Sequence, residues 1–395
     1  MYMNTVSRSR KTAWAAMLLA SSLALAACGG EDGESDEQQA KNSAPEVANP
    51  LALTYDGGIY VLDGETLKVA KDVKLGGYNR LNPAGDDSHV MVSTAEGFRV
   101  LDAAGQKMTG IEFKGAEPGH VVRHHGKTVL FTDGTGEVTV FDPADLGGGQ
   151  PEAETYKSAE PHHGVAIKLK NGELVTTLGT AEKRTGIMVL DGKHKEITRS
   201  EKCPEVHGEA TAKDEAVVIG CEDGVLVYKD GKITKVDSPT EYGRIGNQRG
   251  SEKSPVVLGD YKKDADAELE RPQQISLIDT ETKKLKLVDL GTSYTFKSLA
   301  RGPEGEALVL GTDGNIHVID PNSGKVVDTF PVLGKWTEPM DWQQPRPELF
   351  VRGDTAYVTD PEKKRVYALD AATGKKKATG TLPRKPNELS GVDAS

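Results

Sequence analysis

One strand–turn–strand phrase recurs along the chain from residue 51 to the C-terminus. Apolar residues alternate with polar ones over about five positions, and each run ends in a turn, usually opened by Asp in forms such as DG, DP or D-x-x-TG. Alternation with a period of two that ends in such a turn is typical of a β-hairpin. Eight copies occur, at residues 58–69, 97–108, 137–146, 186–197, 224–236, 274–288, 315–327 and 365–377.

The copies are spaced like the blades of a propeller. Their marker aspartates, beginning with Asp63 and Asp102, follow one another at intervals of 39 to 50 residues. A four-stranded blade has this length, and further apolar segments before the phrases supply the remaining strands, the shortest first. We therefore predict an all-β chain with an eight-bladed β-propeller over residues 49–395. Seven blades is the alternative, if two phrases share a blade. A β-sandwich would not keep eight copies at this spacing.

The two ends of the repeat are incomplete in complementary ways. The first phrase has no room before it for an innermost strand, whereas residues 388–395 (ELSGVDAS) resemble an innermost strand with nothing after it. The C-terminal strand is therefore predicted to complete the first blade, which closes the ring and removes a sheet edge. The longer intervals carry insertions, of which residues 251–271 are charge-rich and are predicted to form a surface loop.

The N-terminus has the form of a lipoprotein signal. The basic segment SRSRK precedes an apolar run of 16 residues that ends in Leu-Ala-Ala-Cys28. This predicts a signal peptide at residues 1–27, lipidation of Cys28, and a disordered tether at 28–48. The apolar run is short for a membrane span, so contact with the membrane is expected only through the lipid, on the extracytoplasmic face. An ordinary signal peptide with a chance cysteine is the alternative.

The net charge limits the kinds of binding partner to expect, and the cysteine content bears on the pairing of the thiols in an oxidising compartment. The net charge of −11 argues against nucleic acid or an anionic membrane surface as a partner and mildly favours cations. Beyond Cys28 the chain has only Cys203 and Cys221. In an oxidising compartment this pair predicts a disulfide. A zinc site that uses both thiols is the weaker alternative, because the chain has no CxxC motif.

Three histidines, at matched positions in three consecutive repeats, are the candidate metal ligands. His120, His163 and His207 each stand at the start of a predicted innermost strand, 43 and 44 residues apart. Equivalent positions of neighbouring innermost strands meet at one mouth of the channel, so the three imidazoles should converge. Imidazole nitrogen is a common zinc ligand, which predicts a Zn²⁺ site. Copper and nickel also accept imidazole, and a structural cluster without metal is the alternative.

Two acids are candidates to complete this metal site. Glu209 follows His207 by two residues, so it is a candidate ligand or a hydrogen-bond acceptor for an imidazole N–H. Asp341 is predicted to begin a later innermost strand and is a further candidate ligand.

The remaining histidines near these strands are secondary metal candidates. Successive strand residues face opposite ways, so only one member of the pair His162–His163 can face the channel, and the blade spacing favours His163. His124 and His125 follow the His120 strand in a predicted turn and are expected to be exposed.

Enzymatic motifs are lacking. The sequence has no G-x-S-x-G, no P-loop and no HExxH, and most of its Asp-Gly pairs, including Asp133, are assigned to turns. The chain is therefore predicted not to be an enzyme, with a metal-dependent hydrolase or lyase as a less favoured alternative.

The fragments PHHGVA (161–166), CPEVHGEA (203–210) and GCEDG (220–224), together with His120, resemble the zinc metallochaperones of the AztD kind, which are exported β-propeller proteins. The resemblance covers residues 48–395. It implies zinc ligands at His120, His163 and His207, a Cys203–Cys221 disulfide, and delivery of Zn²⁺ to the solute-binding protein of a zinc ABC transporter. Members can also carry a His-rich N-terminal segment, but residues 29–50 contain no histidine. The alternative function is a non-catalytic propeller scaffold for protein interaction at the cell surface.

Overall fold

A computed structural model describes residues 46–393 of the chain. The predicted signal peptide, Cys28 and most of the predicted tether lie outside these residues. The described residues fall within one compact unit. Among them, no helix has the length and apolar character needed to cross a membrane.

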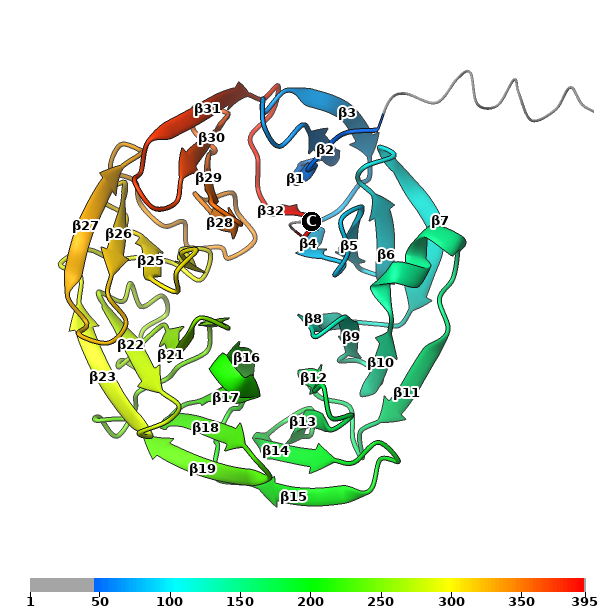
Figure 1. Ribbon diagram of the computed structural model, residues 1–395, viewed down its shortest axis with the longest axis vertical. Coiled ribbons are helices and arrows are strands. Elements are labelled where there is room, and N and C mark those ends of the chain that lie inside the picture. Colours follow the sequence, from blue (N-terminus) through cyan, green and yellow to red (C-terminus); the bar gives the residue numbers. More distant parts are fainter. Residues whose placement is uncertain (1–45, 394–395) are drawn as a thin grey trace, which may run out of the picture. The chain divides into compact units, whose positions relative to one another are not determined.

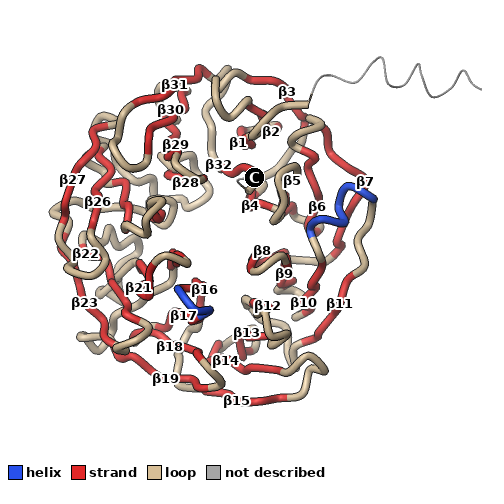
Figure 2. Tube along the Cα trace, in the orientation of Figure 1, coloured by secondary structure: helices blue, strands red, loops and turns tan. Residues whose placement is uncertain are grey.

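In residues 46–393, eight four-stranded antiparallel sheets are arranged in a ring (Figure 1). Residues of the innermost strands line a central channel. The prediction of an eight-bladed propeller is confirmed, and the seven-bladed alternative is wrong. Apart from two short 3₁₀ helices, η1 (Pro143–Gly148) and η2 (Lys213–Glu215), the regular structure is all strand (Figure 2).

Each of the first four blades runs from an innermost strand at the channel to an outermost strand at the rim. In that order their strands are β32 (Leu389–Gly391), β1 (Leu51–Tyr55), β2 (Gly58–Leu62) and β3 (Val69–Lys74); β4 (Arg80–Pro83), β5 (His89–Thr94), β6 (Gly97–Asp102) and β7 (Lys107–Lys114); β8 (Pro118–His124), β9 (Lys127–Thr132), β10 (Glu137–Phe141) and β11 (Ala153–Lys157); and β12 (Ala166–Lys168), β13 (Leu174–Gly179), β14 (Arg184–Leu190) and β15 (Glu196–Ser200).

Blades five to eight follow in the same order. They are β16 (His207–Ala212), β17 (Ala216–Cys221), β18 (Gly224–Lys229) and β19 (Lys232–Asp237); β20 (Gln248–Ser251), β21 (Ser254–Gly259), β22 (Gln274–Asp279) and β23 (Lys284–Asp289); β24 (Leu299–Arg301), β25 (Ala307–Leu310), β26 (Asn315–Ile319) and β27 (Val326–Pro331); and β28 (Leu349–Arg352), β29 (Thr355–Asp360), β30 (Arg365–Asp370) and β31 (Lys376–Thr381).

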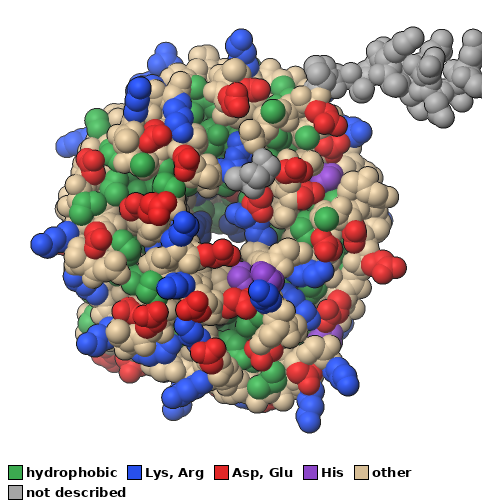
Figure 3. All heavy atoms as spheres, in the orientation of Figure 1, with side chains coloured by type: hydrophobic (Ala, Val, Ile, Leu, Met, Phe, Trp, Pro, Cys, Tyr) green, Lys and Arg blue, Asp and Glu red, His purple; other side chains and the backbone are tan. Residues whose placement is uncertain are grey.

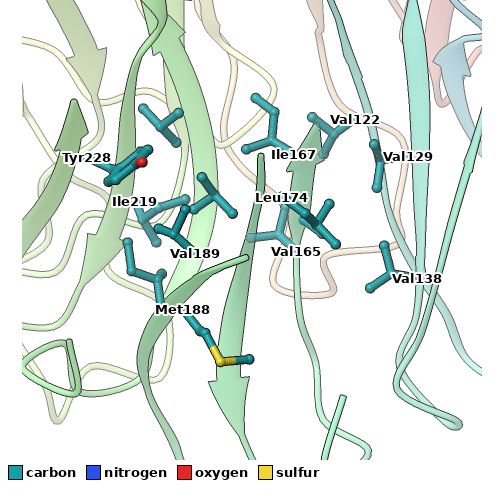
Figure 4. Packing of buried hydrophobic residues seen from close by; sticks show 14 of the residues in the cluster. Val122, Val129, Val138, Val165, Ile167, Leu174, Met188, Val189, Ile219 and Tyr228 are labelled. Carbon is teal, nitrogen blue, oxygen red and sulfur yellow. The ribbon is translucent and has the colours of Figure 1, made fainter. Parts of the chain in front are cut away.

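The hydrophobic core lies between neighbouring blades. The middle strands are buried on both faces, because each sheet is covered by the sheets beside it, whereas the outermost strands are largely exposed. Between blades 3, 4 and 5, Ile167 and Leu174 of blade 4 lie between Val122 of blade 3 and Ile219 of blade 5 (Figure 4). This packing fixes the relative positions of the three blades that carry the candidate histidines.

The C-terminal strand closes the ring as predicted. Strand β32 pairs with β1 through the registers Leu51↔Gly391 and Leu53↔Leu389, so the first blade is built from both ends of the chain. Arg352 of blade 8 also donates hydrogen bonds to the backbone carbonyls of residues 49 and 50, at 2.7 and 2.9 Å.

The prediction of a surface loop over residues 251–271 is wrong in part. Residues 254–259 form β21, the second strand of blade 6, and Val257 and Leu258 in it are fully buried. The charged flanks of this short apolar run obscured it. The irregular segment is confined to the residues between β21 and β22.

Candidate metal site

Three histidines from three consecutive blades meet at one mouth of the channel. His120 lies in β8, His163 lies in the loop ahead of β12, and His207 is the first residue of β16. The centroids of their rings are 5.0 to 5.4 Å apart. One ring nitrogen of each lies within 4.8 Å of the others, and this is the one group of three or more possible metal ligands found in residues 46–393.

The spacing of these nitrogens suits a small cation. Zinc binds imidazole nitrogen at about 2.1 Å, so two ligands of a tetrahedral site stand about 3.4 Å apart. The ligand nitrogens therefore need to approach one another by about 1.4 Å at most to reach this spacing. His163 is the most accessible of the three, with 40 % of its side chain exposed, against 19 % for His120. The cluster can therefore be reached from solvent through His163.

A bulge in β16 positions His207. The register of β16 with β17 shifts between His207 and Glu209, and Gly208 adopts a φ of +73°, which favours glycine. A Cβ at Gly208 would lie only 2.5 Å from the carbonyl oxygen of Gly246. That same oxygen lies 2.7 Å from Nδ1 of His207. The backbone of β16 therefore approaches that of Gly246 closely, and Nδ1 of His207 hydrogen-bonds to the Gly246 carbonyl. This leaves Nε2 of His207 free for a ligand.

Electrostatics keep His207 in its neutral form. Burial, followed by the neighbouring imidazoles of His120 and His163, lowers the pKa of His207 well below the ordinary 6.5. The guanidinium of Arg244 acts in the same direction. Because only the neutral imidazole binds a metal, His207 is ready to bind at neutral pH.

Two carboxylates contact the other histidines through Nδ1. Glu209 Oε2 lies 3.5 Å from Nδ1 of His120, so this acid contacts the blade-3 histidine across the blade boundary. Asp133 Oδ2 lies 2.5 Å from Nδ1 of His163. Such contacts to the second ring nitrogen fix the orientation and tautomer of metal-binding histidines. All three histidines therefore have a partner at Nδ1.

Asp133 is the site residue that sequence reasoning missed. It belongs to an Asp-Gly pair that the sequence pattern assigns to a turn, and it does follow β9 in a turn. However, its carboxylate also accepts a hydrogen bond from the backbone N–H of Gly164, at 3.2 Å. The turn of blade 3 thereby holds the loop of blade 4 that carries His163. Asp-Gly turns are frequent in this chain, so sequence alone offered no signal to distinguish this one.

We expect Asp133→Asn to weaken zinc binding about 10- to 100-fold, the usual effect of removing a carboxylate that orients a metal-bound imidazole. Asparagine keeps an oxygen for the Gly164 N–H, so the fold should be unchanged. Isothermal titration of the metal-free protein with Zn²⁺ measures the change. Asp313→Asn is the matched control, because Asp313 makes a similar contact to His317, at 3.1 Å, in blade 7. Equal weakening by both substitutions would contradict the assignment.

A disulfide braces the loop before His207. Cys203 and Cys221 are bonded, with their Cα atoms 4.9 Å apart, so the alternative of a zinc site that uses both thiols is wrong. Cys221 ends β17, the strand that pairs with β16, and Glu222 N–H donates to the carbonyl of Pro204 at 2.9 Å. The loop from Cys203 to His207 is thereby tied to its neighbouring strand at both the side-chain and the backbone level.

His162 points away from the cluster. Only 3 % of the residue is exposed, and it packs against the ring of Phe131. Its Nδ1 lies 2.9 Å from the carbonyl oxygen of Glu160 and its Nε2 lies 3.0 Å from Oγ1 of Thr177. Both ring nitrogens are therefore already occupied, which leaves none for a metal.

Burial lowers the pKa of His162 below 6.5, which predicts an acid sensitivity of the metal-free protein. The unfolded chain takes up a proton here below about pH 6.5, whereas the folded chain resists it, so stability falls as the pH falls. We expect His162→Gln to lose less thermal stability than the wild type between about pH 7.5 and about pH 5.5. Thermal denaturation at the two pH values measures this, and an unchanged or larger loss would contradict it.

His124 and His125 lie at the opposite end of β8. His124 lies four positions after His120 along the strand, a distance of about 13 Å. His124 Nε2 lies 2.8 Å from Glu215 Oε1, which also accepts a hydrogen bond from the backbone N–H of Lys170. This contact links blades 3, 4 and 5 at the far mouth. His125 is exposed as predicted, but the prediction is wrong for His124, whose side chain is only 9 % exposed. The structure does not bring His124 or His125 to the three-histidine cluster.

Asp341 does not begin an innermost strand, so that part of the prediction is wrong. The innermost strand of blade 8 is β28, which starts at Leu349, and Asp341 lies in the irregular loop before it. Its side chain is exposed and accepts a hydrogen bond from the backbone N–H of Gln343, at 2.9 Å. The structure does not place it with the histidines. The insertion in this blade displaced the strand beyond the position that the repeat spacing indicated.

Comparison with known proteins agrees with the architecture and with the predicted resemblance. No family model matches the chain. A curated relative, the zinc chaperone AztD of Citrobacter koseri, is 27 % identical over 305 residues, which are 75 % of this chain and 70 % of the relative. The resemblance to AztD is thereby confirmed, and the match agrees with the prediction that the chain is not an enzyme.

Solved structures show the same fold. Apo AztD from Citrobacter koseri superposes with a TM-score of 0.75 at 23 % identity, covering 88 % of this chain and 98 % of the other. The dihydro-heme d1 dehydrogenase NirN superposes with a TM-score of 0.59 at 14 % identity, covering 88 % and 75 %. At these identities the superpositions establish the propeller alone.

Proposed function

We propose that this protein is a zinc metallochaperone that carries Zn²⁺ at His120, His163 and His207. The observation that carries the proposal is the convergence of three imidazoles from three blades, with their ligand atoms within 4.8 Å. Each has a partner at Nδ1, an arrangement that prepares Nε2 for a metal. The similarity to a zinc chaperone supports zinc as the cargo.

The site suits a carrier because it supplies three nitrogens and is open on one side. His120 and Glu209 line a channel cavity of about 570 Å³. A tetrahedral zinc ion held by three histidines keeps one position for water or for a ligand from a receiving protein. Exchange at that position gives the metal a route out, which a closed four-ligand site lacks. Glu209 and Asp133 orient the imidazoles in this proposal and are not themselves ligands.

The receiver in this proposal is the solute-binding protein of a zinc ABC transporter. The support is the similarity to AztD, together with the accessible position of His163 at the channel mouth. The test is to load the purified protein with Zn²⁺, mix it with the metal-free solute-binding protein from the same organism, separate the two and measure zinc in each. Transfer faster than the spontaneous release of zinc into a chelator supports the proposal. Failure to bind zinc, or transfer no faster than release, would overturn it.

We also propose that the protein is held at the extracytoplasmic face of the membrane by a lipid on Cys28. The support is the sequence of residues 1–28 alone. We expect Cys28→Ser to move the protein from the membrane fraction to the soluble extracytoplasmic fraction, because the remaining apolar run is too short to span a bilayer. Immunoblots of the two fractions measure this. A wild-type protein found mainly in the soluble fraction would contradict the anchor.

A further inference from the structure

The eight blades place a ring of charged or titratable side chains around one mouth of the channel. Each blade contributes one side chain within three residues of the start of its innermost strand. In ring order from blade 1 to blade 8, these residues, which we call the channel ring, are Glu388, Arg80, His120, His163, His207, Arg249, Lys297 and Glu348. The three histidines form an arc on one side, and an arginine flanks each end of the arc.

The carboxylates of the channel ring already have partners. Lys297 contacts Glu388 directly and Glu348 at 3.5 Å, and its own side chain is only 3 % exposed. Glu388 also accepts a hydrogen bond from the hydroxyl of Tyr78, at 3.0 Å, and Glu348 accepts one from the backbone N–H of Leu389, at 2.9 Å. Burial raises the pKa of Glu348, and Lys297 offsets the charge of Glu388, so this cluster carries little net charge.

The two arginines are left without a carboxylate in contact. Within residues 46–393 the guanidinium of Arg80 makes no hydrogen bond or ion pair, and that of Arg249 donates only to the backbone carbonyl of Gln248, at 2.8 Å. Both side chains line the channel cavity. Glu209 and Glu348 lie near enough to influence Arg249, and Arg80 lies near enough to influence Glu388. The direct contacts of these acids are with His120 and Lys297. On the face shown in Figure 3, Lys and Arg side chains also lie around the central opening.

We infer that Arg80 and Arg249 bind a small dicarboxylate anion inside the channel. A guanidinium presents a rigid fork of donors that matches a carboxylate, and it stays charged throughout the physiological range. Charge-assisted contacts are stronger in a confined cavity than in bulk water. A cavity of about 570 Å³ is large enough for a small molecule. A ligand with one carboxylate for each arginine is the simplest match to two guanidinium groups that lie at the two ends of the histidine arc.

This site does not require the proposed zinc function. Its charges come from residues outside the histidine cluster, so metal-free protein should bind the anion. A cation at the histidines would add positive charge beside the site and would strengthen anion binding, and by linkage the anion would then strengthen retention of the cation.

The test is titration of the metal-free mature protein with succinate at low ionic strength, followed by calorimetry or NMR. Wild-type protein should show saturable binding that weakens as salt is added. Arg80→Gln and Arg249→Gln should each weaken it by about tenfold or more, the effect expected for loss of a charge-assisted hydrogen bond. Acetate, which engages one arginine at a time, should bind more weakly than succinate. Arg365→Gln is the control, because Arg365 is exposed at the start of β30, away from the channel ring.

Two outcomes would overturn the inference: no saturable binding of succinate by the wild type, or equal affinity in the wild type and the Arg80→Gln/Arg249→Gln variant. Zinc titration and circular dichroism of each variant report whether the fold and the histidine site are intact. If a glutamine variant fails to fold, the lysine variants Arg80→Lys and Arg249→Lys serve instead. They keep the charge but lose the fork, so they should reduce the preference for succinate over acetate.

Discussion

Zinc binding should be lost when His163 and His207 are both replaced by alanine. Structural zinc sites with four protein ligands bind with about 10–16 kcal/mol, so one ligand contributes roughly 3 kcal/mol and two contribute roughly 6 kcal/mol. A loss of that size weakens affinity by about four orders of magnitude. His120 would remain as a single imidazole, which does not hold zinc against solvent or buffer. Calorimetric titration of the metal-free variant should therefore show no specific binding of Zn²⁺.

The matched control for this experiment is His124→Ala/His125→Ala. It removes the same number of imidazoles from the same protein, but from the opposite mouth of the channel, where His124 contacts Glu215. This variant should bind zinc like the wild type. Retention of binding in the His163/His207 variant, or its loss in the control, would remove the three-histidine cluster as the zinc site. The comparison also separates a specific site from the general affinity of histidines outside the cluster for metal.

Loss of the Cys203–Cys221 disulfide should have the largest effect on stability of any change considered. The cysteines are 18 residues apart, and a cross-link over a loop of this size removes chain entropy from the unfolded state that amounts to about 3 kcal/mol. Both cysteines are fully buried within the core cluster of blades 3 to 5, so serine hydroxyls in their place add an unfavourable burial. We expect Cys203→Ser/Cys221→Ser to lower the free energy of unfolding by about 3 kcal/mol or more.

Chemical denaturation with and without a thiol reductant tests this prediction. Reductant should destabilise the wild type and leave the serine variant unchanged, since the variant has no bridge to lose. Zinc affinity of the folded variant should also fall, because the loop before His207 loses one of its two ties to β17. A wild type that is insensitive to reductant under conditions that fully unfold it would contradict a stabilising bridge.

The repeat made most of the fold predictable. Eight phrases at blade-like intervals favoured eight sheets, and the C-terminal segment from residue 388 had the incomplete first blade to pair with. The same spacing identified the histidines, because His120, His163 and His207 occupy matched positions in the blades. Repetition converts sequence separation into spatial proximity, which is why residues more than 40 apart could be grouped without a structure.

Departures from the repeat were not predictable. The strand at 254–259 was hidden by charged neighbours, and the insertion before β28 moved Asp341 out of register. Asp133 looked like every other Asp-Gly turn, and its role depends on the loop of the next blade reaching across to it. The bulge at Gly208 similarly follows from contact with the backbone of blade 6. These features arise from contacts between neighbouring blades, and the sequence pattern of a single repeat does not reveal such contacts.

The position of the seam has a consequence for assembly in the cell. Blade 1 is completed only when β32 is available to pair with β1, so the ring cannot close until the last residues have left the ribosome. The histidine arc, in contrast, belongs to blades 3 to 5, which are contiguous in the chain and do not include the seam. The chain can therefore bring all three imidazoles of the arc together while the ring is still open, before β32 pairs with β1.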